Sequence, residues 1–302
     1  MNDKLFNPNY LQSLCAKYGL KPSKKYGQNF LIDPVKSGHR PVFAHGEQFN
    51  GVNLDPVEKM IEAAEIKKTD TVIEIGPGFG VLTFALAEKA KKVIAFEIEK
   101  KLAPYWAEQI KQFPNITVEW GNMLRELGTV NRELGNSKVV ANLPYQITSA
   151  VIRAFLEAEN PPEKMVLMVQ KEVAERICAK PGDMSLMSVS VQYYANPEII
   201  AIVSRSNFWP EPSVDSAIIK ITLHSERLRK RDVEVDGRFF RVVKAGFSNR
   251  RKLLSKNLES IFGKSRRGEV AEIFSKLGLK TTVRAQELSI EQWKEIAEKL
   301  SC

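Results

Sequence analysis

Short apolar runs alternate with amphipathic segments from the start of the chain to about residue 224. Short β-branched and apolar runs predict strands, whereas apolar residues that recur every three or four positions predict helices. These patterns place strands at 71–75, 92–96, 115–120, 138–141 and 164–169, and helices at 8–18, 57–64, 81–90, 101–113, 148–157 and 172–178. Strands that alternate with helices form a mostly parallel sheet with helices on both faces. The pattern therefore predicts an α/β, Rossmann-like fold, whose ligands bind at the carboxyl ends of the strands.

Two later segments and one loop have other patterns. We expect residues 188–194 and 216–223 to be strands that pair as an antiparallel hairpin. Residues 35–54 have neither a helical nor a strand period and are rich in Gly, His, Asn and Phe. An inserted loop is the interpretation that suits such a segment.

The pattern becomes wholly helical after the charge run ERLRKRD at 226–232. Helices are expected over 237–245, 253–261, 269–277 and 290–300. We therefore expect two domains. Residues 1–224 would form the α/β domain, with an N-terminal arm and the inserted loop, and residues 225–302 a small all-helical domain.

The stretch TVIEIGPGFG at 71–80 organises the first domain. Its strand ends at Gly76, Gly78 and Gly80, where the backbone can turn tightly and a ligand can approach without meeting a Cβ. The next strand ends on Glu97, near the offset of roughly 20 residues at which an acidic side chain meets ribose hydroxyls. This order predicts a nucleotide-binding crevice, a feature that dinucleotide enzymes share.

Two details of the turn bear on which nucleotide it binds. The spacing is G-x-G-x-G rather than G-x-G-x-x-G, and Glu74 stands just before the first glycine. A second carboxylate there would repel a pyrophosphate. We therefore expect a ligand without phosphate, and S-adenosylmethionine, a sulfonium that carries an adenosine, fits this requirement.

The charge balance indicates a polyanionic partner. The 302 residues include 45 Lys and Arg against 36 Asp and Glu, which gives a net charge of +9, and nucleic acid is the first candidate. Basic clusters lie at 250–252 and 266–267 of the helical domain. Each cluster alone would better suit a solvated face, whereas several on one small domain favour contacts with phosphates.

Other composition features bear on compartment and metal binding. Cys15, Cys178 and Cys302 are far apart and form no Cys-x-x-Cys pair, which favours a reducing compartment and argues against a zinc site. His39 and His45 have no matching Cys or acidic ligand pattern, so we expect no metal. No secretory leader and no long apolar run is present, so we expect a cytoplasmic protein that does not contact membranes.

A polar turn closes the strand at 138–141. In Asn142-Leu143-Pro144-Tyr145, an amide and a backbone carbonyl held by the proline can accept hydrogen bonds from an exocyclic amine. A neighbouring aromatic ring can stack on a base. Such a turn by itself is also typical of an ordinary loop, but its place beside the glycine turn and Glu97 favours an active site.

Seven stretches together resemble the ribosomal RNA adenine dimethyltransferases (the KsgA family), which are related to the Erm methyltransferases. These stretches are KKYGQNFLID, EIGPGFGVLT, FEIEK, NLPYQI, FWPEPSVDSAI, GFSNRRKLLSKNL and RAQELS. They occur in the order of the family over nearly the whole chain, and only the loop at 35–54 departs from the pattern. The resemblance implies a class I methyltransferase fold with a seven-stranded sheet and a helical domain that binds rRNA.

The resemblance also implies a reaction. Two methyl groups would pass from S-adenosylmethionine to the N(6) amine of each of two adjacent adenosines near the 3′ end of 16S rRNA. The implied cofactor-binding residues are Asn29, Leu31, Gly76, Gly78, Glu97, Asn122 and Asn142. The implied catalytic residues are Asn142, Leu143, Pro144, Tyr145 and Phe208. Tyr145 and Phe208 would enclose a flipped adenine between their rings, and catalysis would consist mainly of positioning, with no metal and no covalent enzyme intermediate.

RNA-binding residues and one departure from the family complete the expectation. The implied RNA contacts are Lys24 and Lys25 in the arm and Arg250, Arg251 and Lys252 in the helical domain. The expected partner is the small-subunit rRNA of an immature 30S particle, and the protein is expected to be a monomer. Asn122 occupies the place of the usual aspartate, and we expect its amide oxygen to accept from the cofactor's adenine with a loss of about 1 kcal/mol.

Three other functions compete with this one. An Erm-like enzyme would methylate 23S rRNA, but the C-terminal stretch through RAQELS and the GQNFL arm favour the small subunit. A non-catalytic ribosome-assembly protein that binds RNA would not need Asn142, Tyr145 or the glycine turn, all of which are present. A small-molecule or protein N-methyltransferase would have little use for the basic helical domain.

Overall fold

The computed structural model describes residues 3–22, 28–32, 56–126, 137–225, 228 and 232–300. The chain divides into two compact units, the first made of 1–174 and 198–223 and the second of 175–197 and 224–302. The chain leaves the first unit for the last time between residues 223 and 224, next to the expected domain boundary at 224/225. Residues 175–197, which the sequence pattern assigned to the α/β domain, group instead with the C-terminal helices.

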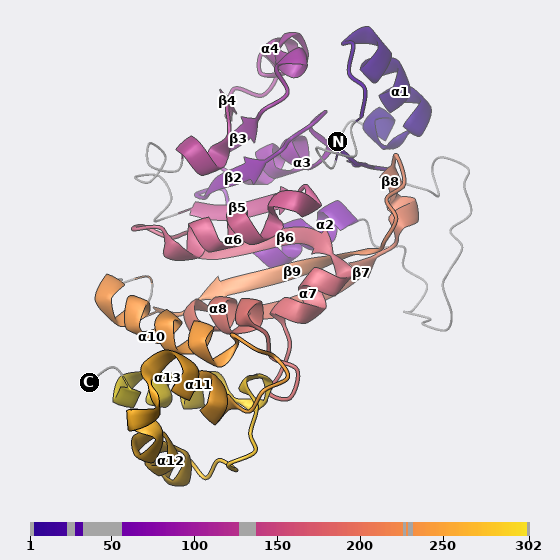
Figure 1. Ribbon diagram of the computed structural model, residues 1–302. Coiled ribbons are helices and arrows are strands. Elements are labelled where there is room, and N and C mark those ends of the chain that lie inside the picture. The colour runs from indigo at the N-terminus through magenta and orange to yellow at the C-terminus, as the bar shows by residue number, and fades with distance from the viewer. Residues whose placement is uncertain are drawn as a thin grey trace. The chain divides into compact units, whose positions relative to one another are not determined.

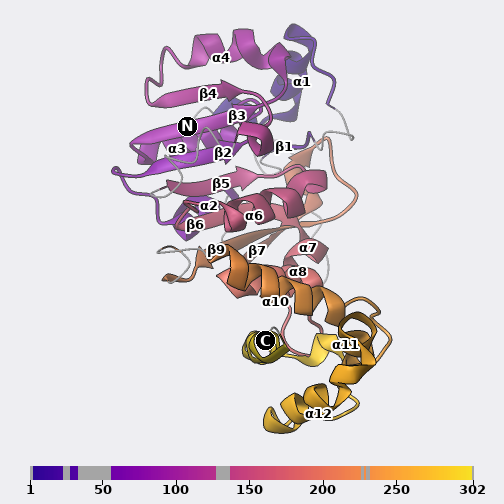
Figure 2. The same cartoon turned by 60° about the vertical axis from the view of Figure 1, so that its left-hand side comes forward.

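Seven of the described strands form one sheet in the order β4-β3-β2-β5-β6-β9-β7. The neighbours from β4 through β6 are parallel, and β9 runs antiparallel to β6. Figures 1 and 2 show these strands side by side. Their bounds are β2 (Thr71–Ile75), β3 (Lys92–Glu97), β4 (Ile116–Trp120), β5 (Ser137–Asn142), β6 (Lys164–Gln170), β7 (Ala195–Val203) and β9 (Ser216–Leu223). The central strands are buried almost throughout, which explains their continuous apolar runs.

Helices cover both faces of this sheet. In both views α2 and α3 lie on one face and α6 on the other (Figures 1 and 2). The helices associated with the strands are α1 (Pro8–Lys17), α2 (Pro56–Ala64), α3 (Val81–Lys89), α4 (Ala103–Gln109), α6 (Thr148–Glu157) and α7 (Lys171–Ile177). This arrangement confirms the α/β class and the mostly parallel sheet.

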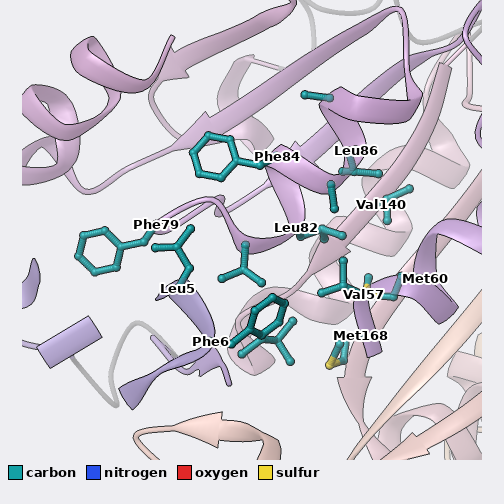
Figure 3. Packing of buried hydrophobic residues seen from close by; sticks show 14 of the residues in the cluster. Leu5, Phe6, Val57, Met60, Phe79, Leu82, Phe84, Leu86, Val140 and Met168 are labelled. Carbon is teal, nitrogen blue, oxygen red and sulfur yellow. The ribbon is translucent and has the colours of Figure 1, made fainter. Parts of the chain in front are cut away.

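The core on the α2/α3 face fixes the start of α3. Figure 3 shows Leu82 and Leu86 of α3 beside Val57 and Met60 of α2 and Val140 of β5. These five side chains are between 0 and 4% exposed. Because the helix is anchored by this packing and β2 by its neighbours, the glycine turn between them has both ends held in place.

The expected strand at 188–194 is wrong, because this segment lies in a helix, α8 (Leu186–Tyr194). The hydroxyl of Ser185 accepts the N–H of Ser188, and the hydroxyl of Ser188 accepts the N–H of Ser185. This capping box starts a helix despite the alternating Val and Ser residues. The strand follows as β7, at the edge of the sheet, where Pro197 is tolerated. The expected pairing of 188–194 with 216–223 is therefore wrong as well: β9 lies between β6, with which it pairs antiparallel, and β7.

The second unit is helical and contains α8 with four helices close to the expected ones. Their bounds are α10 (Val233–Gly246), α11 (Leu254–Phe262), α12 (Arg267–Lys276) and α13 (Ile290–Leu300). Trp293, Phe239 and Leu258 form part of its core, each 2% exposed or less. The Nδ2 of Asn257 donates to the carbonyl oxygens of Gly246, at 2.6 Å, and Asn249, at 2.9 Å. These bonds hold the turn between α10 and α11 that carries the 250–252 cluster.

No helix in the described part of the chain combines the length and apolar character needed to cross a membrane.

Gly246→Ala should destabilise the second unit, because an added Cβ would collide with the buried ring of Trp293. We expect the free energy of unfolding to fall by about 1–3 kcal/mol, as in other overpacked cores, measured by urea denaturation. The matched control is Gly237→Ala in the same helix, where no atom lies within 4 Å of the added Cβ. That change should raise stability by up to about 1 kcal/mol. Equal effects of the two changes would contradict the packing described.

Candidate active site

A cavity of about 170 Å³ opens at the carboxyl ends of β2, β3, β4 and β5. Residues that follow these strands line it, together with residues 28–31 of the arm. None of the described lining residues is Lys, Arg or His, whereas two of them, Glu74 and Glu97, carry carboxyl groups. A wall without cations suits a neutral or positively charged ligand better than a phosphate.

Backbone forms the wall of the cavity at the end of β2. Gly76, Gly78 and Gly80 have φ angles of 72°, 55° and 88°, in the left-handed region that favours glycine. A Cβ on Gly76 would stand in open space beside the cavity, with no atom within 4 Å. A Cβ on Gly78 would lie 3.0 Å from the ring of Phe30 in the arm. The glycines therefore allow both a ligand and the arm to approach the turn.

Glu97, the last residue of β3, is 5% exposed and linked to this turn. Its Oε2 accepts the N–H of Gly78 at 3.2 Å, and its Oε1 accepts the N–H of Glu99 at 2.8 Å. Burial raises the pKa of Glu97, and these backbone donors partly offset the increase. The bonds orient the carboxylate at the cavity wall, where its remaining lone pairs can accept from two hydroxyls of a ligand.

Glu74 is the second carboxyl group of the wall and is 2% exposed. Its Oε2 has no hydrogen-bond partner among the described residues. Burial raises the pKa of Glu74 to about 8, and the nearby Glu97 carboxylate adds to the increase. The group is therefore mostly protonated at neutral pH. The expectation that its charge repels a pyrophosphate is corrected accordingly.

Asn142 ends β5 and faces the same cavity. Its Nδ2 donates to the backbone oxygen of Asn29 at 3.4 Å. This weak bond uses the donor end of the amide, and Oδ1 accepts no hydrogen bond from the described residues. The cavity therefore presents an amide acceptor on the side of β5, next to Pro144.

The part of the arm that lines the cavity includes a short strand. β1 (Phe30–Leu31) pairs antiparallel with β8 (Phe208–Trp209), and the N–H of Ile32 donates to the oxygen of Asn207 at 2.8 Å. The ring of Phe30 packs on Phe79 of the glycine turn and on Trp209 of β8. These contacts join the arm to the turn on one side and to β8 on the other.

Comparisons with known proteins agree with this architecture. A family model described as ribosomal RNA adenine dimethylase matches residues 48–301. The chain belongs to this family. The resemblance noted in the sequence is thereby confirmed.

Curated relatives cover nearly the whole chain. A protein of Dehalococcoides mccartyi named ribosomal RNA small subunit methyltransferase A is 41% identical over 92% of this chain and 88% of its own length. A protein of the same name from Streptococcus equi subsp. zooepidemicus is 37% identical over 96% of this chain and 95% of its own length.

Two solved structures of methyltransferases share the fold. The 23S rRNA methyltransferase ErmE is 27% identical with a TM-score of 0.67, over 83% of this chain and 99% of that one. A dimethyladenosine transferase from Plasmodium falciparum is 25% identical with a TM-score of 0.69, over 80% of this chain and 94% of that one. The class I methyltransferase fold is thus confirmed for this member of the family.

Most of the cofactor-binding and catalytic residues that the family resemblance implies line the cavity. Those that line it are Asn29, Leu31, Gly76, Gly78, Glu97, Asn122, Asn142 and Pro144. Leu143 and Phe208 are not among the lining residues, and their side chains are buried, at 2% and 3% exposure. Tyr145 follows Pro144 outside the lining, half-buried, and its hydroxyl is bonded to Ser216.

Sequence reasoning missed several lining residues, among them Ile98 and Phe30. Ile98 directly follows Glu97 and is 57% exposed, which is unusual for a large apolar side chain. Its position after the acidic residue was the available signal. Phe30 also lines the cavity, and its role depends on contacts with Phe79 and Trp209 that are distant in sequence.

Asn122 differs from its expectation in one respect. Its Oδ1 accepts the N–H of Leu124 at 3.0 Å, as a capping residue does. The acceptor end of the amide is thus engaged by the backbone, and the NH₂ end has no partner among the described residues. The side chain therefore offers the cavity donors more readily than the acceptor that we expected.

The predicted RNA contacts lie in two places. Lys24 and Lys25 fall outside the described residues, as do His39, His45 and the loop at 35–54. Arg250, Arg251 and Lys252 are exposed in the second unit. The last two line a basic groove of about 560 Å³, whose other lining residues are Leu253, Lys256, Glu259, Ser260 and Lys264. Both carboxylate oxygens of Glu259 are paired, with Lys256 and Arg267. Since this is the one carboxylate among the described lining residues, against four cationic ones, the groove carries a net positive charge.

Glu74→Gln should remove a pH dependence of stability. The pKa of Glu74 is about 8 in the folded protein and has an ordinary value of 4.5. Between these values the folded state keeps a proton that the unfolded state has lost, so the free energy of unfolding falls as the pH rises. The slope is at most about 1.4 kcal/mol per pH unit. Urea denaturation at about pH 5.5 and 7.5 should show that the free energy of unfolding falls more in the unsubstituted protein than in Glu74→Gln. Parallel changes in both proteins would contradict the raised pKa of Glu74.

Proposed function

We propose that this protein transfers methyl groups from S-adenosylmethionine to the N(6) amines of two adjacent adenosines near the 3′ end of small-subunit rRNA. One observation carries the proposal: Asn142, whose Oδ1 accepts no hydrogen bond from the described residues, lines the same cavity as Glu97. Glu97 ends β3 and Asn142 ends β5, with β2 between them, so an acceptor for an amine and an acceptor for a ribose diol would lie at the same edge of the sheet.

The lining residues fit a nucleoside that carries a sulfonium and no phosphate. Glu97 would hold the ribose hydroxyls, and the glycine turn would lie against the amino-acid part, since its backbone faces the cavity next to Glu97. The apolar side chain of Ile98 and the donor end of Asn122 would meet the adenine beyond the ribose. The absence of Lys, Arg and His from the described lining supports a ligand without phosphate.

When bound, S-adenosylmethionine supplies an electrophilic methyl group. Asn142 would accept a hydrogen bond from the exocyclic amine of the target adenine, which draws the nitrogen lone pair out of conjugation with the ring. The bond from Asn142 Nδ2 to the arm would hold the amide in that orientation. Pro144 would fix the backbone beside it. The contribution of these residues to the rate would be positioning of the amine.

Two aromatic residues would receive the flipped base. Tyr145 lies immediately beyond Pro144 with its ring half-buried. Phe208 is 3% exposed, so its ring would have to turn out of the core before it could stack on a base. Leu143, buried at 2%, would support the turn from below rather than touch the substrate.

The second unit would bind the rRNA backbone. Arg251, Lys252, Lys256 and Lys264 in the groove would contact phosphates, aided by Arg250 beside it. Lys24 and Lys25 would make further phosphate contacts from the arm. We propose an immature small subunit as the substrate, a monomer as the active form and the cytoplasm as the place of action.

The deciding experiment offers labelled S-adenosylmethionine with under-methylated small subunits and, separately, with large subunits. The modified nucleotides are then mapped. Dimethylated adenosines near the 3′ end of the small-subunit rRNA support the proposal. Label in the large subunit alone would favour the alternative that the similarity to ErmE suggests.

Asn142→Ala should abolish methyl transfer while leaving cofactor binding mostly intact. Loss of a positioned acceptor is expected to lower kcat by about 100-fold or more, measured with saturating S-adenosylmethionine. Calorimetric titration with S-adenosylhomocysteine should give a Kd within a few-fold of the unsubstituted value. Glu97→Ala is the matched contrast, because loss of this carboxylate should mainly weaken the affinity for S-adenosylhomocysteine in the same titration. Unchanged turnover in Asn142→Ala would remove this residue from the catalytic role.

Replacing Arg251, Lys252 and Lys256 by Gln should flatten the salt dependence of RNA binding. Each phosphate contact contributes about 0.7–0.9 to the slope of log K against log salt, so the slope should decrease by about 2–3. The control is a set of three exposed lysines at the amino-terminal edge of the sheet, Lys89, Lys91 and Lys111, changed in the same way. If both triple variants shift the slope equally, the groove has no special part in RNA binding.

A further inference from the structure

Tyr145 is held by a buried partner that sequence motifs did not single out. Its phenol oxygen lies 2.8 Å from Oγ of Ser216, and either atom can donate the hydrogen bond. Ser216 is 0% exposed, so it cannot touch a substrate itself. The bond joins the turn after β5 to the start of β9, 71 residues further along the chain.

The position of Ser216 is rigid because the sheet fixes it. Ser216 pairs with Gln170 at one end of the ladder between β6 and β9. The N–H of Lys171 donates to the backbone oxygen of Asp215, next to Ser216, at 3.0 Å. A hydroxyl held in this way can fix the direction of the ring that is bonded to it.

The same place also holds the segment that leads to the second aromatic residue. The Oδ1 of Asp215 accepts the N–H of Arg205 at 3.0 Å, and Arg205 begins the short helix that ends directly before Phe208. The start of β9 therefore contacts both the hydroxyl of Tyr145 and the backbone that leads to Phe208.

The phenol itself is suited to an anchoring role. Burial raises the pKa of Tyr145, the bond to Ser216 lowers it in part, and the Asp215 charge raises it further. The hydroxyl therefore stays neutral at physiological pH and can keep its bond to Ser216. The face of the ring, rather than the oxygen, is the part left for a planar ligand.

We propose that Ser216 is a positioning residue for base binding, which fixes the ring of Tyr145 beside the cavity through the buried hydrogen bond. A ring that is already oriented loses less rotational freedom when a base stacks on it, so the amine reaches the bound cofactor in the productive orientation more often. This inference rests on the proposed function, since it assumes that Tyr145 receives the adenine.

The test is a double-mutant cycle of Tyr145→Phe and Ser216→Ala, with turnover measured on under-methylated small subunits. Each single change removes the same hydrogen bond and should lower kcat about tenfold, as loss of one buried bond does, and the double variant should be no slower than either single one. The KM for S-adenosylmethionine and the Kd for S-adenosylhomocysteine should stay unchanged. Ser216→Thr keeps a hydroxyl and should recover most of the activity.

A structural role alone predicts a different pattern. Ser188→Ala is the matched control, because Ser188 is also a 0% exposed, hydrogen-bonded serine but lies in the second unit. It should lower thermal stability without changing kcat. Wild-type kcat in Tyr145→Phe, which preserves the ring and the fold, or additive losses in the double variant, would overturn the positioning role. An unsubstituted protein that is inactive on small-subunit rRNA would overturn the proposed function itself and this inference with it.

Discussion

The hydrogen bond from the Gly78 N–H to the Glu97 carboxylate joins the two strand ends on which the cavity depends. It forms only because the backbone between β2 and α3 is left-handed at three glycines, and a side chain at any of these positions would strain the turn. Packing of α3 against α2 and β5 holds the far end of that turn. These unusual backbone conformations thus all lie in the glycine turn between β2 and α3. The packed core around this turn holds it rigid.

The protonation of the two carboxyl groups in the cavity wall depends on this close packing. Two carboxyl groups lie within one small, largely buried wall, where both cannot be ionised without a high free energy. Glu97 has backbone donors, whereas Glu74 has an oxygen without a partner among the described residues and a pKa that burial raises to about 8. The wall therefore combines one oriented carboxylate with one protonated carboxyl and suits a ligand that brings hydroxyls and positive charge.

The arm and the β9 segment link parts of the site that the parallel sheet alone would leave independent. Phe30 packs between Phe79 and Trp209, and β1 pairs with β8, so the arm contacts both the glycine turn and the strand that carries Phe208. The start of β9 provides the second link, through Ser216 and Asp215. Aromatic packing and a short strand ladder can position the arm with few residues. A ring side chain has only one or two torsions to restrict, so a few contacts suffice.

Periodicity and spacing along the chain were sufficient to predict the α/β class, the glycine turn, Glu97 and Asn142 as neighbours, and the four C-terminal helices. These features depend on local backbone preferences and on the rule that parallel strands end at one edge of the sheet. Only the tertiary structure revealed that 188–194 is a capped helix, that Phe208 is buried, that burial raises the pKa of Glu74, and that Ser216 is hydrogen-bonded to Tyr145. Burial, protonation and long-range partners are set by contacts between segments far apart in the chain, and no local pattern encodes such contacts.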